Sequence, residues 1–297
     1  GGTGFIGKAL CAALVKAGHA VVVLTRDVEI AGPLLGDLVE TVEWNADAGG
    51  SWMSVVDGAD AIINLAGESI GDGRWSAARK QRIIGSRLSA TTALVQAIGK
   101  ARHKPTVMVN SSAIGYYGSR GEEMITEKDP PGNDFLAETT KQWEEAAKKV
   151  EAHGVRLVLL RTGVVLERGG ALEKFLTPFR LFVGGPLGSG RQWFSWIHRD
   201  DVVGLILLAL QNNAVKGALN ATAPTPQTMK DFCASLGKAL GRPSWAPVPS
   251  FVLKLVLGEM SKMVLTGQRV MPAAAEKAGY KFKYRTSEEA LSSILGK

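Results

Sequence analysis

Apolar and polar positions alternate with two different periods along the first half of the chain. Phe5 to Lys16 carries its apolar residues at helical spacing, and Ala20 to Thr25 is a short continuous apolar run, typical of a strand buried on both faces. Further strand-like runs are Glu40–Trp44, Ala61–Gly67, Thr106–Ser112 and Val155–Arg161. Helical segments between them are Ser76–Lys100 and Asp134–Val150. Strands that alternate with crossover helices predict an α/β fold with a doubly wound parallel sheet.

The pattern changes after Gly169. Glycines, prolines and aromatic residues crowd the following stretch, above all Val183 to Gly190, and the remainder is mostly helical. The helices expected there are Asp200–Leu210, Met229–Leu240, Phe251–Leu265 and Ser287–Leu295. This half of the sequence predicts a smaller, mostly helical lid that folds against the sheet.

Composition narrows the class of protein only slightly. The 297 residues are 45% hydrophobic and 21% charged, as in an ordinary globular enzyme, and the apolar runs are too short for a membrane span. The net charge is +7, but Lys and Arg are spread along the chain, so we expect no nucleic-acid partner; a basic lining for a phosphorylated ligand stays open. Cys11 and Cys233 lie in apolar helical patterns, which indicates core thiols. The four histidines share no ligand spacing, so no metal site is predicted.

The first seven residues carry the clearest chemistry. Gly1, Gly4 and Gly7 have the spacing G-x-x-G-x-x-G, and an apolar helix follows at once. Such a loop turns tightly, brings backbone N–H groups to a pyrophosphate and aims the helix dipole at that anion. The residues expected to contact a dinucleotide here are Gly1, Thr3, Gly4, Phe5, Ile6 and Gly7.

A loop of this kind normally follows a strand, yet none precedes Gly1, and the first residue is not Met. We therefore expect the sequence to begin inside the protein, after a missing strand of roughly 5–6 residues. A targeting segment would lie further upstream, so the compartment is unknown; a bacterial cytoplasm and an organelle stroma or matrix are both plausible.

Several short motifs resemble those of one enzyme superfamily. They are Gly1–Gly7, Asn64–Glu68, Arg74-Trp75, Ser86-Arg87, Gly115–Gly118, Gly184–Gly190, Trp193–His198, Pro247–Pro249, Leu257–Glu259, Gly267-Gln268 and Gly279–Phe282. The chain resembles the extended or atypical short-chain dehydrogenases/reductases, and within them the epimerase-family group of predicted nucleoside-diphosphate-sugar epimerases with a characteristic C-terminal domain. This resemblance implies an NADP-binding Rossmann domain over residues 1–166, to which residues 193–223 return. Residues 167–192 and 224–297 would form the substrate-binding C-terminal subdomain.

The residue after the second strand of the implied fold bears on the choice of cofactor. NAD-binding folds usually place Asp or Glu there to accept from the ribose 2′-OH, whereas Arg26 would pair with a 2′-phosphate. Arg26 favours NADP(H), but Asp27, one residue later, weakens this preference. Arg26 could also be a plain surface arginine. The resemblance implies that Asn64, Leu65, Ala66 and Gly67 lie along the adenine and ribose side of the groove, with Ser111 as a further cofactor contact.

The resemblance also implies a Ser or Thr acting with a Tyr-x-x-x-Lys pair, in which Tyr transfers the proton and Lys lowers its pKa. The serine role falls on Ser112, but no tyrosine in the chain has Lys four residues later. The corresponding positions hold Phe135 and Thr139, or alternatively Leu136 and Thr140. Neither pair can move a proton at neutral pH.

Other residues offer substitutes. Tyr116 and Tyr117 follow Ser112 at the carboxyl end of the sheet, where open α/β folds bind ligands, and Glu68 is a candidate base. Arg161 fits either a substrate phosphate or a structural ion pair. Candidate residues of the substrate wall are Gln192 and Trp193. Each of these side chains also has a plain packing or surface interpretation.

Two functions therefore stay open. The first is an NADP(H)-dependent oxidoreductase or epimerase-like enzyme for an unknown small molecule, with Ser112 and Tyr116 or Tyr117 moving the proton. The second is a catalytically inactive NADP(H)-binding protein that serves as an assembly or regulatory factor, with a partner in a larger complex. Loss of the Tyr–Lys pair with retention of the glycine loop favours the second.

Overall fold

The computed structural model of the protein describes residues 1–296. Four parallel strands form its main sheet. Their order is β10-β6-β4-β3, so chain neighbours cross over rather than form hairpins. The strands are β3 (Ala61–Asn64), β4 (Val107–Ala113), β6 (Arg156–Thr162) and β10 (Gly217–Ala221). The predicted doubly wound parallel sheet is confirmed.

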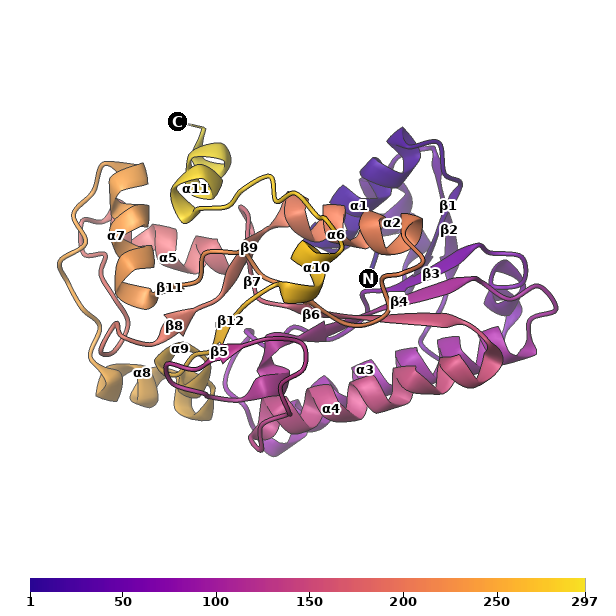
Figure 1. Cartoon of the computed structure of the whole chain (residues 1–297), viewed down its shortest axis with the longest axis horizontal. Helices are drawn as coiled ribbons and strands as arrows, with labels where there is room; N and C mark the ends of the chain where they lie inside the picture. Colours follow the sequence, from indigo (N-terminus) through magenta and orange to yellow (C-terminus); the bar gives the residue numbers. More distant parts are fainter. Residues whose placement is uncertain (297) are drawn as a thin grey trace.

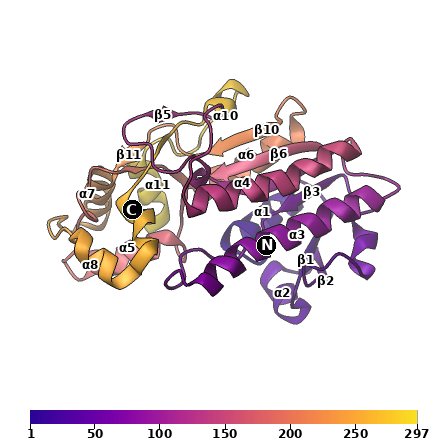
Figure 2. The same cartoon turned by 90° about the horizontal axis from the view of Figure 1, so that it is seen from below.

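Helices cover both faces of this sheet (Figure 1). On one face are α1 (Phe5–Lys16) and α6 (Arg199–Gln211), and on the other are α3 (Ala77–Lys100) and α4 (Phe135–Lys148). Figure 2 shows α3 and α4 running side by side. Successive residues of β4 point to opposite faces: Val107 and Val109 pack with the α1 and α6 side, and Met108 packs with the α3 side. The apolar runs of the sequence are thus buried on both faces, as predicted.

A second pair of parallel strands lies beside this sheet, formed by β1 (Val21–Thr25) and β2 (Val39–Glu43). The first two residues of the chain lie between the pair and the main sheet. A Cβ on Gly2 would be 2.6 Å from a methyl of Val23 in β1, and one on Gly1 would be 2.4 Å from the backbone of Leu65 after β3. The expectation of a strand before Gly1 stays a prediction.

Helix boundaries follow the capping residues that the sequence offers. The Ser76 side chain accepts from the Arg79 N–H at the start of α3, and the Asp134 side chain accepts from the Ala137 N–H at the start of α4. Three α-helices were not predicted. Two of them, α2 (Val28–Leu35) and α5 (Ala171–Arg180), each contain a proline, which lowers any helix expectation, and the third, α10 (Ala273–Lys277), is only five residues long.

Much of the second half of the chain, apart from α6 and β10, forms the mostly helical lid, at the left of Figure 1. Its core is built from aromatic and aliphatic residues of several segments, among them Phe194, Trp196, Phe232 and Leu291. Its remaining helices are α7 (Met229–Leu240), α8 (Ser250–Leu257), α9 (Lys262–Leu265), α10 (Ala273–Lys277) and α11 (Ser287–Leu295). The 3-10 helices of the chain are η1 (Ser51–Val55), η2 (Ile114–Tyr117), η3 (Lys149–His153) and η4 (Gly258–Ser261).

The expectation of one continuous helix from Phe251 to Leu265 was wrong. The chain ends α8 at Leu257 because Gly258 has a positive φ of 59°, which a right-handed helix cannot contain. The 3-10 turn η4 and the short α9 follow. The apolar periodicity alone did not reveal this break.

Short strands connect the lid to the sheet. The parallel pairs are β7 (Val164–Leu166) with β9 (Trp196–His198) and β5 (Met124–Ile125) with β12 (Arg269–Val270), and β8 (Trp193–Phe194) is antiparallel to β11 (Gln227–Thr228). The C-terminal segment is held by the fully buried Asp201, whose carboxylate accepts from the Tyr280 hydroxyl and from the Lys283 and Tyr284 N–H groups at 2.7–3.0 Å.

Candidate functional site

The glycine loop packs too tightly to admit side chains at two of its glycines. A Cβ on Gly7 would lie 2.3 Å from the carbonyl oxygen of Gly1, and a Cβ on Gly1 would lie 2.4 Å from the carbonyl of Leu65. The Gly4 N–H donates to the Gly1 carbonyl at 3.1 Å and closes the turn. The backbone itself therefore forms the surface that a ligand would meet.

The turn leads directly into α1. Gly4 is the N-cap and supplies no side chain, and the first helical hydrogen bond runs from Lys8 N–H to Gly4 C=O at 2.8 Å. The N–H groups of Phe5, Ile6 and Gly7 precede that bond and have no partner within the helix. With the helix dipole behind them, these three donors form the type of cradle that binds a phosphate.

Arg26 lies at the end of β1 with its side chain exposed, and no carboxylate of the described residues lies within ion-pair distance of it. The neighbouring Asp27 is engaged elsewhere, because its Oδ1 accepts from the Ile30 N–H at 3.0 Å and caps α2. Of the two candidates at this position, only Arg26 is free to meet a ligand, and a guanidinium fits a phosphate.

Asn64 shapes the wall opposite the loop. It is buried, and its Nδ2 donates to Thr91 Oγ1 at 3.0 Å and to Asn110 Oδ1 at 2.7 Å. Its Oδ1 accepts from the Ala66 N–H at 3.1 Å, which turns the chain out of β3. Asn64 therefore positions Leu65, Ala66 and Gly67, and its own side chain has no group free for a ligand.

Arg87 is a site residue to which the sequence analysis gave no role. A Cβ on Gly67 would be 3.2 Å from its Cζ, so the guanidinium lies against the wall after β3. Its Nη1 donates to the carbonyls of Glu68 and Ile83 at 3.0 and 2.9 Å, and burial lowers its pKa to about 10. No carboxylate of the described residues lies within ion-pair distance of it, although the charge of Glu68 opposes the lowering of its pKa, so a partly buried positive charge stands beside Gly67. In the sequence, only the Ser86-Arg87 motif singled out this arginine.

Glu68 is engaged by basic side chains. Its Oε1 accepts from Arg79 Nη1 at 2.5 Å and from Arg82 Nε at 3.3 Å, and its backbone N–H donates to Ser86 Oγ at 3.0 Å. Glu68 thus anchors the wall to α3.

The helix face where the Tyr–Lys pair would lie is apolar. Phe135 meets Trp75 edge to face with ring centroids 5.0 Å apart, and Leu136 belongs to the same cluster, which reaches Met260 of the lid. The hydroxyls of Thr139 and Thr140 are buried and donate back to carbonyls of their own helix. This face packs the lid against α4 and offers no proton donor.

The candidate catalytic residues instead meet around a buried ion pair. Arg161 donates from Nε and Nη2 to the two carboxylate oxygens of Glu144, each at 2.8 Å. Burial alone would lower the pKa of Arg161, but the bond to Glu144 outweighs it and raises the pKa. Ser112 Oγ donates to Glu144 Oε1 at 2.7 Å. Of the two earlier interpretations of Arg161, the structural ion pair describes what the structure contains.

Glu144 was missed by the sequence analysis, although the sequence held a signal. It lies on the buried stripe of α4 with Ala137, Thr140 and Ala147, at spacings of three and four residues. A carboxylate on an apolar helix face needs a buried cation, and Arg161 is that cation.

The two tyrosines belong to the same network. Tyr117 is fully buried, and its hydroxyl donates to Asn220 Oδ1 at 2.7 Å and accepts from Arg161 Nη1 at 3.0 Å. Burial raises the pKa of Tyr117 to about 12, which leaves the hydroxyl protonated at neutral pH. The Tyr116 ring is half-buried with Arg161 Cζ 3.5 Å from its centroid. Tyr117 has no surface to present to a ligand.

Ser111 precedes this network on β4 and is half-buried; its carbonyl accepts from Asn110 Nδ2 at 2.7 Å. The described contacts of Ser112, Tyr116 and Tyr117 lie with Glu144, Arg161 and the β5–β12 side, and none of them is with the glycine loop.

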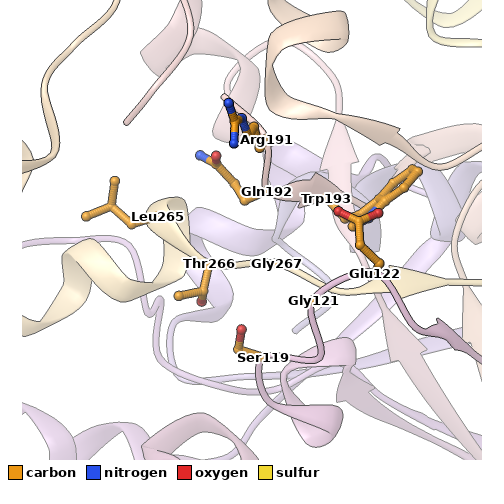
Figure 3. Close-up of a pocket in the computed structure, with 9 residues that line it drawn as sticks. All are labelled: Ser119, Gly121, Glu122, Arg191, Gln192, Trp193, Leu265, Thr266 and Gly267. Atoms are coloured by element: carbon orange, nitrogen blue, oxygen red, sulfur yellow. The ribbon is translucent and has the colours of Figure 1, made fainter. Parts of the chain in front are cut away.

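Gln192 and Trp193 line a cavity of about 210 Å³ between the lid and residues 119–122 (Figure 3). Gln192 Nε2 donates to the carbonyls of Leu187 and Val264, and Trp193 Nε1 donates to Glu122 Oε2 at 2.9 Å. Figure 3 shows the Glu122 carboxylate beside the Trp193 ring. The remaining lining residues are Ser119, Gly121, Arg191, Leu265, Thr266 and Gly267.

Over residues 1–296, no group of three or more His, Cys, Asp or Glu side chains is arranged to hold a metal ion. None of the helices in this range has both the length and the apolar content needed to cross a bilayer. Cys11 and Cys233 are free and buried.

Two family models match the chain. One, described as the NAD dependent epimerase/dehydratase family, matches residues 1–221, and the other, a domain of unknown function (DUF1731), matches residues 248–294. The chain is 44% identical to the chloroplastic epimerase family protein SDR39U1 homolog of Arabidopsis thaliana, over 99% of this chain and 85% of that protein. It is 39% identical to epimerase family protein YfhF of Bacillus subtilis, over 99% and 96% of the two chains.

Solved structures give the same picture. The human epimerase family protein SDR39U1, crystallised with NADPH, superposes with a TM-score of 0.89 at 36% identity and covers 99% of this chain and 97% of its own. A UDP-glucuronic acid 4-epimerase from Bacillus cereus, in complex with UDP-glucuronic acid and NAD, has a TM-score of 0.80 at 17% identity over 99% and 96% of the chains. That second likeness shows the fold alone.

Proposed function

The chain belongs to the NAD dependent epimerase/dehydratase family, and from that premise we propose that it binds NADP(H) without the Tyr–Lys proton transfer of dehydrogenases and epimerases. In this proposal it acts as an NADP(H)-loaded assembly or regulatory factor with a protein partner. One observation carries it: Ser112 and Tyr117 donate into a buried network around Glu144 and Asn220, while the pair positions hold Phe135 and Thr139.

The residues present fit the cofactor. The free N–H groups of Phe5, Ile6 and Gly7 would take the diphosphate, and Arg26 would take the 2′-phosphate. Arg87 would add a guanidinium that forms no ion pair with a described carboxylate, although the charge of Glu68 acts on it. The human relative crystallised with NADPH supports the choice of nucleotide. When bound, the cofactor supplies a hydride donor or acceptor, but the positions of the Tyr–Lys pair on α4 hold Phe135 and Thr139, and the ammonium of Lys80, 4.9 Å from the Phe135 ring centroid, is paired with Glu259.

Titration calorimetry with NADPH and NADH, followed by a turnover screen, tests the proposal. The screen uses aldehydes, ketones, alcohols and nucleoside-diphosphate sugars with the purified chain. We expect NADPH to bind more tightly than NADH and no substrate to change the redox state of the nucleotide. Turnover in proportion to protein concentration would contradict the inactive role, and the absence of any nucleotide binding would contradict the whole proposal.

An NADP(H)-dependent oxidoreductase is the second candidate, and the cavity beside Gln192 and Trp193 favours it because it has room for a small ligand. Tyr116 is then the proton donor, since its ring is half-exposed and Arg161 stacks on it. For any substrate found in the screen, Tyr116→Phe should lower the rate by ~10²–10⁴. Tyr117→Phe is the matched control, because its hydroxyl is buried. Full activity of Tyr116→Phe would exclude this mechanism.

A further inference from the structure

Exposed apolar side chains concentrate on the lid. Over residues 1–296, seven of the twelve large hydrophobic side chains that are exposed to solvent belong to it. These seven, which we call the lid patch, are Leu181, Phe182, Val183, Trp245, Phe251, Leu255 and Val256. They follow α5, precede α8 or lie on α8, and none belongs to the core of the lid. A monomer gains nothing from such a group of exposed apolar residues.

Helix α8 provides one part of the patch. None of its eight residues is buried, and Phe251 and Leu255, one turn apart on the same face, are 71% and 73% exposed. The helix is held in this orientation, because the Arg74 guanidinium donates to the carbonyl oxygens of Leu255 and Val256 at its end. The apolar face is therefore directed outward by a contact with the body of the protein.

Phe182 and Trp245 provide the other part. Trp245 Nε1 donates to the Phe182 carbonyl at 2.9 Å, and Arg242 Cζ lies 4.2 Å from the centre of the Phe182 ring. Phe182 has a φ of 63°, a left-handed conformation that is strained for a bulky residue. A strained backbone that keeps an aromatic side chain in solvent points to a use for that side chain.

Positive charge surrounds the patch without any negative charge in the same segments. Residues 174–199 and 232–258 contain no Asp or Glu. The exposed basic side chains there include Lys238, Arg242 and Lys254, together with Arg180, which pairs with Glu173 at 3.2 Å. Positive charge thus predominates beside the patch, and acidic residues, such as Glu173 and Glu259, stand only at the borders of these segments.

We propose that the lid patch binds a negatively charged lipid surface. Aromatic and aliphatic side chains that enter the headgroup region, flanked by Lys and Arg, are the chemistry of proteins that lie on membranes. A specific protein partner would favour anchors that fill shaped pockets and charges of both signs. Helix α8 lies at the end of the molecule away from β1 and β2 (Figures 1 and 2), so the glycine loop stays clear of such a surface.

Vesicle flotation of the full chain tests this inference. We expect binding to phosphatidylcholine vesicles that contain phosphatidylglycerol, no binding to phosphatidylcholine alone, and loss of binding at high salt. The double variant Phe251→Ser/Leu255→Ser should lower partitioning by at least ~10-fold, because it removes most of the apolar area that α8 would bury. A charge variant, Arg242→Glu/Lys254→Glu, should lower it by a similar factor without loss of apolar area.

The matched control is Ile30→Ser/Leu34→Ser on α2, whose side chains are 61% and 50% exposed but lie beside Glu29. It should leave partitioning unchanged. Failure of the wild-type chain to bind anionic vesicles at low salt would overturn the inference, and so would full binding by both patch variants. Self-association that the patch variants abolish, with no vesicle binding, would overturn it in favour of a second copy of the chain.

Discussion

Glu144 and Arg161 form a two-bond ion pair beneath the carboxyl ends of β4 and β6, and both side chains are buried. Glu144 comes from α4 and Arg161 from the central strand, so the pair ties a face helix to the sheet. The hydroxyl groups of Ser112 and Tyr117 also form hydrogen bonds to this pair. Two side chains of types that can act in catalysis therefore have their hydroxyl groups in the core.

Substituting Glu144 should therefore be costly for stability. Glu144→Gln leaves the Arg161 charge buried without its counter-ion, and we expect the free energy of unfolding to fall by about 3–5 kcal/mol in denaturant titrations. Glu138→Gln is the control on the same helix, since its 3.8 Å contact with Lys141 is exposed and should be worth less than about 1 kcal/mol. Equal stability of the two variants would contradict the role given to the pair.

Gly7→Ala should abolish nucleotide binding. The added Cβ would lie 2.3 Å from the Gly1 carbonyl oxygen, so the loop must open and lose the cradle of N–H groups. Calorimetry should show at least a ~100-fold loss of NADPH affinity, which is close to the lower limit of what two hydrogen bonds to a charged group contribute. Gly32→Ala, whose Cβ would meet no atom within 4 Å, should bind as the parent chain does.

Arg26→Ala separates the two nicotinamide nucleotides. A guanidinium that pairs with the 2′-phosphate contributes only to NADPH binding, so NADPH affinity should fall by ~10–100-fold and NADH affinity should not change. Both affinities are measured by calorimetry at one salt concentration. An equal loss for the two nucleotides would count against the 2′-phosphate role.

Arg87→Met should weaken both nucleotides instead. The side chain keeps its length and its stacking near Trp143 but loses the charge beside Gly67, and we expect a loss of about 10-fold. Arg82→Met, on the same helix but 58% exposed, is the control and should bind both nucleotides as before. Unchanged affinity of Arg87→Met would remove this residue from the site.

Acid should destabilise the fold through His198. Burial lowers the pKa of His198 below its ordinary 6.5, although Asp200 and Glu167 oppose the shift, and Nδ1 must be unprotonated to accept from the Asp200 N–H. The unfolded chain therefore takes up the proton first. The stabilisation is complete above pH 6.5 and is lost below it, by at most about 1.4 kcal/mol per pH unit.

Denaturant titrations between pH 7.5 and 5 check this dependence. His198→Asn keeps a capping acceptor and should flatten the pH profile. A variant of His103, whose side chain is 84% exposed, should retain it.

Much of the fold was predictable because its signals are local. The helix from Phe5 to Lys16 follows from its apolar spacing and the glycines before it, and the Ser76 and Asp134 caps mark the starts of α3 and α4. Hydrogen bonds and apolar stripes that repeat over a few residues can be read without knowledge of distant segments. For the same reason, a glycine loop before a helix could be recognised as the proposed nucleotide site.

The site beyond that loop was not predictable in the same way. Asp27 caps α2, a helix that was not predicted because it contains Pro33, and this leaves Arg26 without a neighbouring carboxylate partner. The helix predicted to continue to Leu265 ends before Gly258, although its apolar pattern continues. Both were misjudged because one backbone angle or one cap outweighs periodicity.

The sequence by itself determined the parallel sheet, the helix starts and the tight glycine turn before α1, since each depends on neighbouring residues. Only the tertiary structure decided that Ser112 and Tyr117 turn inward to the Glu144–Arg161 pair and that Arg87 stands beside Gly67. These contacts join segments up to tens of residues apart. Their energies depend on burying charged groups in an interior that these segments share. The local sequence pattern does not show which segments meet there.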